Sequence, residues 1–165
     1  MKKKFLLVCL IGLVLGIGGV SADHSDGLGI GIIAGGDGGT LGGFFIPTLS
    51  LKVPNVPVFW GVNVLLGSRF GVGVSGDYYI FDRDLVDSGS FNLDWFLGVG
   101  AFGHFFFGDG FSLGAGVRVP VGLSWHINET FELFLEIAPG IGVGINTGSL
   151  LYFVGGGELG LRVWF

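Results

Sequence analysis

Three side chains near the end of one alternating segment have the right types for nucleophilic chemistry. Ser124 and His126 are two positions apart, so in an extended strand they point to the same side, and Glu132 follows after a short connection. A hydroxyl, an imidazole and a carboxylate are the groups that acyl transfer needs within hydrogen-bonding reach of one another. The residue types therefore allow a hydrolase, provided that the strands bring the three groups together.

Other patterns of this kind are weaker. The run Gly98-x-Gly100-x-x-Gly103 has the spacing of a dinucleotide-binding loop, but the helix that such a loop must precede is not predicted after it. The three histidines of the chain lack the spacing of metal ligands. We therefore expect neither a cofactor nor a metal site.

The charge balance excludes nucleic acid as a partner. The chain has 8 Lys and Arg against 13 Asp and Glu, and three of the basic residues are Lys2, Lys3 and Lys4. The five that remain cannot form the basic footprint that nucleic-acid binding requires. The 35 glycines, 50% hydrophobic residues and 13% charged residues are instead typical of a chain that folds in contact with lipid.

The element that holds Ser124 is a long strand. From Phe111 to Trp125 every odd position is apolar, while the even positions are Ser112, Gly114, Gly116, Arg118, Pro120, Gly122 and Ser124. A period of two over this length is the geometry of a strand. One face of such a strand is too apolar for a small soluble sheet, so the surrounding solvent on that face is expected to be lipid.

The N-terminus has the features of a secretory signal peptide. Three lysines precede an apolar run from Phe5 to about Gly19, and Val20-Ser21-Ala22 resembles a small-residue cleavage site. We expect residues 1–22 to be removed and residues 23–165 to form one domain. The only cysteine, Cys9, lies in the removed part, so no disulfide is expected.

Turn signals divide the rest of the chain into eight alternating segments. They run approximately over 27–36, 43–52, 57–66, 69–81, 92–107, 110–126, 130–145 and 150–165. None is long and apolar enough for a membrane-spanning helix, and a closed barrel also satisfies its backbone in lipid. The sequence therefore predicts an all-β fold, an eight-stranded antiparallel transmembrane up-and-down β-barrel located in the bacterial outer membrane.

Charged residues keep to one face of these segments, and that face is expected to be the lumen. A charge near the bilayer midplane costs about 2 to 4 kcal/mol, so the apolar face must meet lipid. Pairing the segments as hairpins puts Asp94 opposite Ser124, Ser124 opposite Glu132, and Arg118 opposite Ala138. We expect a lumen charge network of Asp94, Arg118, Glu132, Glu136, Glu158 and Arg162. Eight strands leave an interior that side chains fill.

Aromatic residues sort into two girdles at the membrane interfaces. With the N-terminus in the periplasm, Trp60, Trp95 and Trp125 lie at the inner boundary, and Phe107 and Phe111 lie at the outer one. The longest connection, 82–91, then falls on the periplasmic side, where small barrels keep short turns. An overlooked strand would be one explanation of that length.

The last residues resemble the assembly signal of outer-membrane proteins. Glu158, Gly160, Val163 and Phe165 supply a polar residue, a glycine, a hydrophobe and a terminal aromatic at the spacing that the barrel assembly machinery reads. This machinery and the membrane lipid are the expected partners, and an extracellular or host ligand is not identified by the sequence.

Two stretches carry a family resemblance. Residues 116–125 (GVRVPVGLSW) and 131–139 (FELFLEIAP), with a looser match at 57–61 (PVFWG), resemble a family of small OmpA-like or OmpW-like outer-membrane barrels of spirochaetes and related diderm bacteria. The likeness covers roughly the C-terminal half. It implies the fold and the location and brings no enzymatic residues.

We therefore expect a barrel with a filled lumen and a structural or surface-interaction role, not an enzyme. Two alternatives remain open from the sequence. One is a narrow, OmpW-like conduit for small apolar molecules. The other is a lipid-modifying hydrolase built on Ser124, His126 and Glu132, although these groups would lie at the periplasmic rim and face inward, away from lipid in the outer leaflet.

Deleting Phe165 should slow assembly of the barrel, because the terminal aromatic is the residue that the assembly signal ends on. Pulse-chase labelling with protease added to the periplasm would measure how long the precursor stays exposed. Assembly at the normal rate would show that another segment holds this information.

Overall fold

The computed structural model describes residues 27–37, 44–67, 69–88, 91–108 and 110–165, so the predicted signal peptide lies outside the described residues. The described part is built of strands, and no helix in it is long and apolar enough to cross a membrane. In chain order the strands are β1 (Gly29–Asp37), β2 (Phe44–Lys52), β3 (Phe59–Leu65), β4 (Phe70–Asp87), β5 (Asn92–Phe107), β6 (Ser112–Arg118), β7 (Val121–His126), β8 (Phe131–Ile137), β9 (Gly140–Ile145), β10 (Leu151–Val154) and β11 (Gly156–Trp164).

These elements form eight barrel strands, because three of the predicted segments are each interrupted once. β6 and β7 are separated at Pro120, β8 and β9 at Pro139, and β10 and β11 at Gly155. Proline has no N–H to give to a sheet ladder, which accounts for the first two interruptions. Neighbouring carbonyls still accept across the breaks, as in the bond from Val119 N to Pro139 O (2.9 Å).

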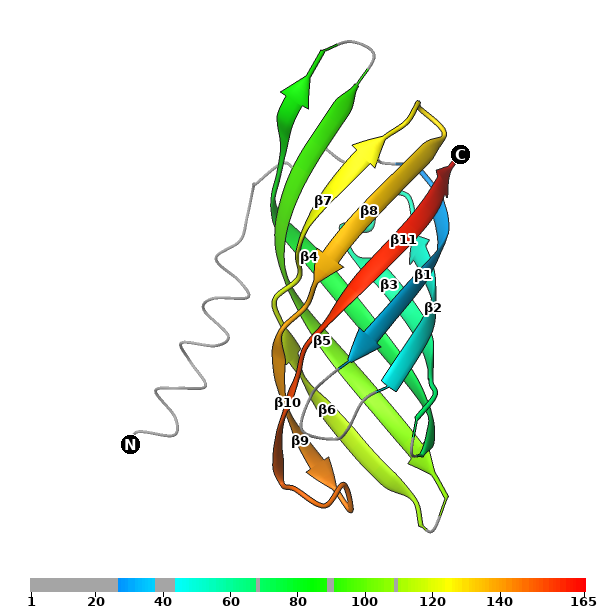
Figure 1. The fold of residues 1–165 in the computed structure, drawn as a ribbon, viewed down its shortest axis with the longest axis vertical. Helices are drawn as coiled ribbons and strands as arrows, with labels where there is room; N and C mark the ends of the chain where they lie inside the picture. The colour runs from blue at the N-terminus through cyan, green and yellow to red at the C-terminus, as the bar shows by residue number, and fades with distance from the viewer. Residues whose placement is uncertain (1–26, 38–43, 68, 89–90, 109) are drawn as a thin grey trace, which may run out of the picture.

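The barrel closes between the first and last strands. β1 pairs antiparallel with β11 from Gly29↔Trp164 to Asp37↔Gly156, and β2 pairs on the other side of β1. Leu28 and Phe165 exchange backbone hydrogen bonds of 3.2 and 2.9 Å just beyond this ladder. The eight-stranded antiparallel barrel predicted from the sequence is therefore confirmed (Figure 1).

Side chains alternate between the lumen and the outer surface along each strand. In β8, Glu132 and Glu136 are buried while Leu135 and Ile137 are more than half exposed, at 55% and 57%. The exposed large hydrophobic residues occur on every strand of the barrel, and the buried polar residues lie inside it. The predicted assignment of the charged face to the interior is thus found in the structure.

The register of one hairpin differs from the prediction. Ser124 lies opposite Phe134, not Glu132, and Arg118 lies opposite Gly140, not Ala138. The cause is a wider turn, in which Asn128 Oδ1 accepts hydrogen bonds from the backbone N–H groups of Thr130 (2.8 Å) and Phe131 (2.9 Å). A shift of two positions keeps every side chain on its predicted face.

The described residues of the long connection 82–91 contain no additional strand. β4 continues to Asp87 and pairs with β5 up to Asp87↔Asn92, with register shifts between Tyr79 and Phe81 and between Asp84 and Val86. The hairpin of β4 and β5 therefore extends past the barrel. In Figure 1 it rises beyond the other turns at the end that holds the C-terminus.

Two glycines let large rings lie across the lumen. A Cβ atom at Gly160 would overlap the Phe134 ring, and one at Gly116 would overlap the Phe102 ring and the backbone of Gly142. These positions need glycine because of close approach, so even a small side chain would displace the lumen packing.

Val117→Arg should prevent stable insertion into a bilayer, whereas Val86→Arg should be tolerated. Both valines point outward, but Val117 lies mid-strand and Val86 lies on the projecting hairpin. An outward arginine costs about 2 to 4 kcal/mol near the midplane and about 0 to 1 kcal/mol near the interface. Urea unfolding in lipid vesicles would measure both. Equal losses would contradict this placement of the membrane.

Candidate functional site: the filled lumen

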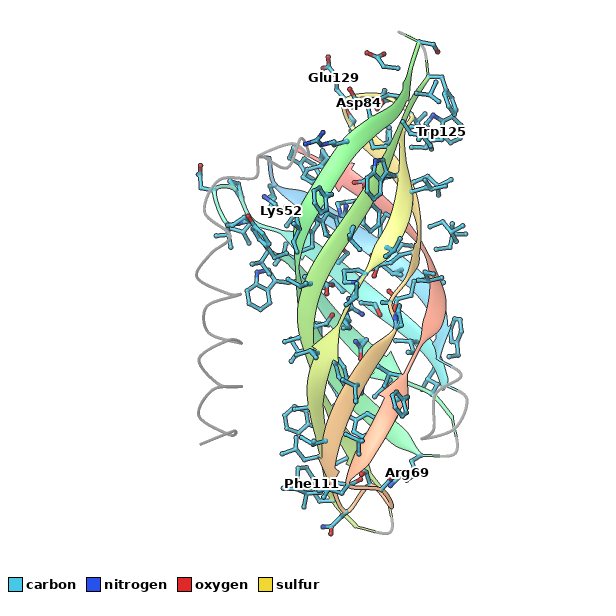
Figure 2. All side chains as sticks on the ribbon, turned by 90° about the vertical axis from the view of Figure 1, so that its left-hand side faces the viewer. Lys52, Arg69, Asp84, Phe111, Trp125 and Glu129 are labelled. Carbon is cyan, nitrogen blue, oxygen red and sulfur yellow. The ribbon has the colours of Figure 1, made fainter. Side chains whose placement is uncertain are left out.

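The lumen is filled by layers of side chains that differ in chemistry. Toward the end that holds the C-terminus lies a layer of aromatic rings around Arg162, at mid-height lies a charged layer around Arg118, and toward the opposite end lies a second apolar layer. Figure 2 shows side chains filling the space between the strands along the length of the barrel.

The aromatic layer holds a buried ion pair. Arg162, which is 2% exposed, donates from one nitrogen to both carboxylate oxygens of Glu132 at 3.0 and 2.8 Å. Its other terminal nitrogen donates to Ser50 (3.2 Å), and Trp164 Nε1 donates to Glu132 Oε2 (2.8 Å). Shared hydrogen bonds of this kind are what make a buried ion pair tolerable.

Aromatic rings enclose this ion pair. The Arg162 guanidinium lies 4.6 Å from the ring centres of both Phe59 and Phe134. Phe59 stacks on Tyr79 at 4.3 Å, and Tyr79 stacks on Phe96 at 4.4 Å. Three stacked rings from β3, β4 and β5 thus close this end of the lumen.

The charged layer is centred on Arg118. Its Nε donates to Asp77 Oδ1 at 2.8 Å and a second nitrogen donates to Asp77 Oδ2, a bidentate pair. Glu136 lies 3.9 Å from the same nitrogen, Nη2, and Glu158 lies 3.8 Å from Nη1. The Tyr79 hydroxyl donates to Glu136 at 3.5 Å. Three carboxylates therefore share one guanidinium.

Register brings Asp77 and Arg118 together across β5. Asp77 and Arg118 both lie opposite Gly100, on its two sides. A Cβ atom at Gly100 would overlap the Asp77 carboxylate, so the glycine opens the path between the two charged groups. The pair is a consequence of the pairing of three strands.

Two small cavities flank the charged layer. One has a volume of about 20 Å³ and the other about 40 Å³, and both are lined by Asn63, Ser75, Arg118 and Glu158. A cavity needs about 10 to 15 Å³ to hold a water molecule. Each of these two cavities therefore has room for water beside Arg118 and not for an organic molecule.

The opposite end of the lumen is closed by apolar side chains. Ile46, Leu65 and Phe106 form a buried cluster there, and Tyr152 is fully buried. Arg69 lies over the Phe106 ring at 5.1 Å and donates to Ser112 at 3.3 Å. Arg69 belongs to the turn between β3 and β4, and its side chain covers this apolar cluster.

The three groups proposed for nucleophilic chemistry are not assembled. Ser124 is fully buried, and its hydroxyl has no hydrogen-bond partner among the described residues. His126 lies in β7, and its Nδ1 is 2.9 Å from Asp94 Oδ2. Glu132 is engaged by Arg162 and Trp164. These three side chains therefore do not form the hydrogen-bonded chain of nucleophile, base and carboxylate that a hydrolase needs.

The predicted network residues thus fall into three groups. Arg118 lies with Glu136 and Glu158, Arg162 lies with Glu132, and Asp94 lies with His126. Four further residues of these layers were not predicted from the sequence: Ser50, Asp77, Tyr79 and Trp164. Asp77 had a usable signal, since it shares the period-two face of Gly71, Gly73 and Ser75 in the same strand.

The predicted girdle residues lie on the outer surface at the two ends. Trp60, Phe107 and Phe111 are 42%, 47% and 55% exposed, and Trp95 and Trp125 are partly exposed. Figure 2 shows Trp125 and Phe111 at opposite ends of the barrel. The described part of the chain contains no group of three metal-ligating side chains.

The residues of the predicted assembly signal lie in or just after β11. Glu158 faces Arg118, Gly160 lies under Phe134, Val163 pairs with Ile30, and Phe165 follows the strand and is 76% exposed. Two of the four therefore also serve the lumen packing.

The outer face carries an apolar groove of about 710 Å³. It lies over β1, β2, β3, β8 and β11, and its lining includes Ile32, Pro47, Leu49, Val62 and Leu159. Two of its lining residues, Ile33 and Thr48, also line the smaller lumen cavity.

Arg118→Met should destabilise the barrel by about 3 to 5 kcal/mol, because it leaves three buried carboxylates without their shared cation. Arg83→Met on the exposed part of the hairpin removes the same side chain from water and should change stability by about 0.5 kcal/mol or less. Urea unfolding of both variants in lipid vesicles tests this. A small loss for Arg118→Met would show that the charged layer is hydrated.

No family model matches the chain, and no curated protein sequence matches it. Solved structures that share its fold include two outer-membrane barrels. One is the crystal structure of Neisserial surface protein A (NspA), with a TM-score of 0.52, 17% identity, and coverage of 84% of this chain and 96% of that one. The other is the N-terminal β-barrel domain of Pseudomonas aeruginosa OprF, with a TM-score of 0.51, 12% identity, and coverage of 83% and 97%. At these identities the likeness establishes the fold, and the spirochaete grouping stays a prediction.

Proposed function

We propose that this chain is an integral outer-membrane barrel whose filled lumen makes it a structural or surface-interaction protein without catalytic activity. The observation on which this depends most is the charged layer, in which Arg118 is held by Asp77 and flanked by Glu136 and Glu158 at mid-height. The aromatic rings on one side and the apolar cluster on the other reinforce it.

The outer-membrane location is supported by the surface of the barrel. Strands on every side expose large hydrophobic residues, while the buried polar residues are inside. A soluble barrel has the opposite need, because its outer face must be hydrated. The likeness of the fold to NspA and to the OprF barrel domain is consistent with this location.

The absence of catalysis is supported by the state of the candidate groups. The Ser124 hydroxyl is buried and donates no hydrogen bond to His126 in the described structure, and the Glu132 carboxylate is held by Arg162. A general base must lie within hydrogen-bonding reach of the nucleophile. The hydrolase alternative therefore lacks its first requirement.

The conduit alternative requires more than the movement of one charge. A path through the lumen must open the stack of Phe59, Tyr79 and Phe96 as well as the Arg118 layer. The cavities of about 20 and 40 Å³ are lined by a mixture of charged, polar and apolar side chains, and both are too small for an organic molecule.

The turns opposite the C-terminal end are short. Those after β5 and β9 leave only residues 108–111 and 146–150 outside strands. Any contact surface that they offer is small, so an interaction role at that end would involve the exposed Phe107 and Phe111 as much as polar turn residues.

In planar bilayers the purified barrel should give no ionic current, and Arg118→Ser should also stay silent because the aromatic and apolar layers remain. A sixteen-stranded porin, whose lumen is open, is the positive control. Current through the wild-type barrel would establish the conduit function. Current through Arg118→Ser alone would show that the charged layer by itself closes the lumen, and that the aromatic and apolar layers do not.

A further inference from the structure

The projecting hairpin has one side along which no described strand runs. β3 pairs with β4 up to Phe59↔Asp77 and ends there, whereas β4 continues to Asp87. On its other side β4 remains paired with β5 as far as Asn92, and β5 is covered in turn by β7. We call the β3 side of residues 78–87 the β4 edge.

The β4 edge has two of the usual protections of a strand edge, charged side chains and register shifts, but lacks others. Proteins commonly place proline or lysine on such edges, and residues 78–87 (YYIFDRDLVD) contain neither. The two register shifts bend the strand, but from Phe81↔Leu97 to Asp84↔Asp94 the pairing is regular. Exposed apolar side chains accompany it, with Leu85 56% and Val86 43% exposed.

The two faces of the hairpin differ in charge. Asp82, Asp84 and Asp87 lie opposite Phe96, Asp94 and Asn92 on the face that continues the lumen. Phe81, Arg83 and Val86 lie opposite Leu97, Trp95 and Leu93 on the outward face, where Phe81 stacks on Trp95 at 6.3 Å. The inward face is acidic, and the outward face is largely apolar with one arginine.

We propose that the β4 edge binds an extended segment of a partner protein by strand addition, with Lys or Arg at alternate positions and apolar residues between them. Backbone hydrogen bonds from β4 would supply affinity, as in other cases of strand addition. Alternate side chains of an added strand would lie on the two faces of the hairpin. Basic side chains would lie beside Asp84 on the acidic inward face, and apolar ones beside Phe81 and Val86 on the outward face, so the partner sequence should alternate with a period of two. The inference goes beyond the proposed function and needs only a folded barrel in a membrane.

A second copy of this chain fits the edge poorly. Two barrels inserted in one membrane have the same orientation, so their β4 strands cannot run antiparallel to each other. Side by side in parallel, related by a two-fold axis along the membrane normal, each residue would lie near its own counterpart. Asp84 would then face Asp84, and like charges directly opposite are destabilising.

Binding can be measured with a defined probe. A fluorescently labelled peptide of alternating Lys and Val is titrated with the barrel, residues 23–165, folded in phosphatidylcholine vesicles, which carry no net charge to attract it. Saturable binding is expected, whereas a peptide of alternating Glu and Val, and one with the same lysines and valines in two blocks, should not bind. Equal binding of the block peptide would overturn the proposal.

Backbone pairing has its own test on the peptide. In an antiparallel ladder the N–H groups of alternate residues point to the same side. N-methylation of one alternate set should weaken binding by about tenfold or more, and methylation of the other set should change it by less than about twofold, since each lost hydrogen bond is worth about 0.5 to 1.5 kcal/mol. Equal effects of the two sets would exclude strand addition.

Matched charge reversals locate the site. Asp84→Lys should weaken binding by about fivefold, whereas Glu129→Lys, on the turn between β7 and β8 at the same end, should change it by less than about twofold. Heat-modifiable mobility on gels checks that both variants fold. Equal losses would mean general attraction to an acidic end of the barrel, and would overturn the proposal.

Two further outcomes would also contradict it. Dimers of the barrel that protect residues 78–87 from proteolysis in the absence of peptide would make a second copy the occupant. Binding that begins only after residues 23–26 are deleted would make the chain's own N-terminal segment the occupant.

Discussion

Closure of the sheet by β1 and β11 is the constraint from which the rest of the structure follows. In lipid, a backbone N–H or C=O group without a partner costs several kcal/mol, so the first and last strands must meet. Their ladder runs along the whole of β1, from Gly29 to Asp37. Once the cylinder is closed, one face of every strand is inside, and an eight-stranded cylinder is narrow enough that its side chains must pack against one another. Charged side chains on the inner face cannot reach lipid or bulk water, so they are stabilised by pairing with one another inside the lumen.

The two buried arginines meet this requirement in different ways. Arg162 has a single carboxylate, that of Glu132, and aromatic rings on its faces, so its charge is balanced locally. Arg118 serves three carboxylates and touches two small cavities, so its layer is the more polar of the two. Removing either cation leaves a charge inside the barrel, which is a larger penalty than the pair's own net contribution. Loss of one member of a lumen ion pair is therefore expected to destabilise the barrel more than replacement of the whole pair.

The sequence predicted the strands well and their pairing less well. Period-two alternation depends on local residues, and for this reason β5 occupies the predicted residues 92–107. The interruption at Pro120 was harder to anticipate, because the apolar alternation continues through it. The two-residue error in the β7 to β8 hairpin came from the side chain of Asn128, whose hydrogen bonds widen the turn. The contact of Asp77 with Arg118 depends on the register of three strands at once, which alternation within one strand does not determine.

The three interruptions of the barrel strands lie side by side. Arg118 and Gly140 pair just to one side of Pro120 and Pro139, Val121 and Ile137 pair just to the other, and Gly155 interrupts the next strand at the same level. Two backbone donors are missing along this line, at Pro120 and Pro139, so fewer hydrogen bonds can join the strands there. The Arg118 layer lies at the same level and joins β6 to β4, β8 and β11 through side chains. The charged layer thus acts as an internal brace, which gives the cylinder transverse stiffness where its hydrogen-bonded wall is thinnest.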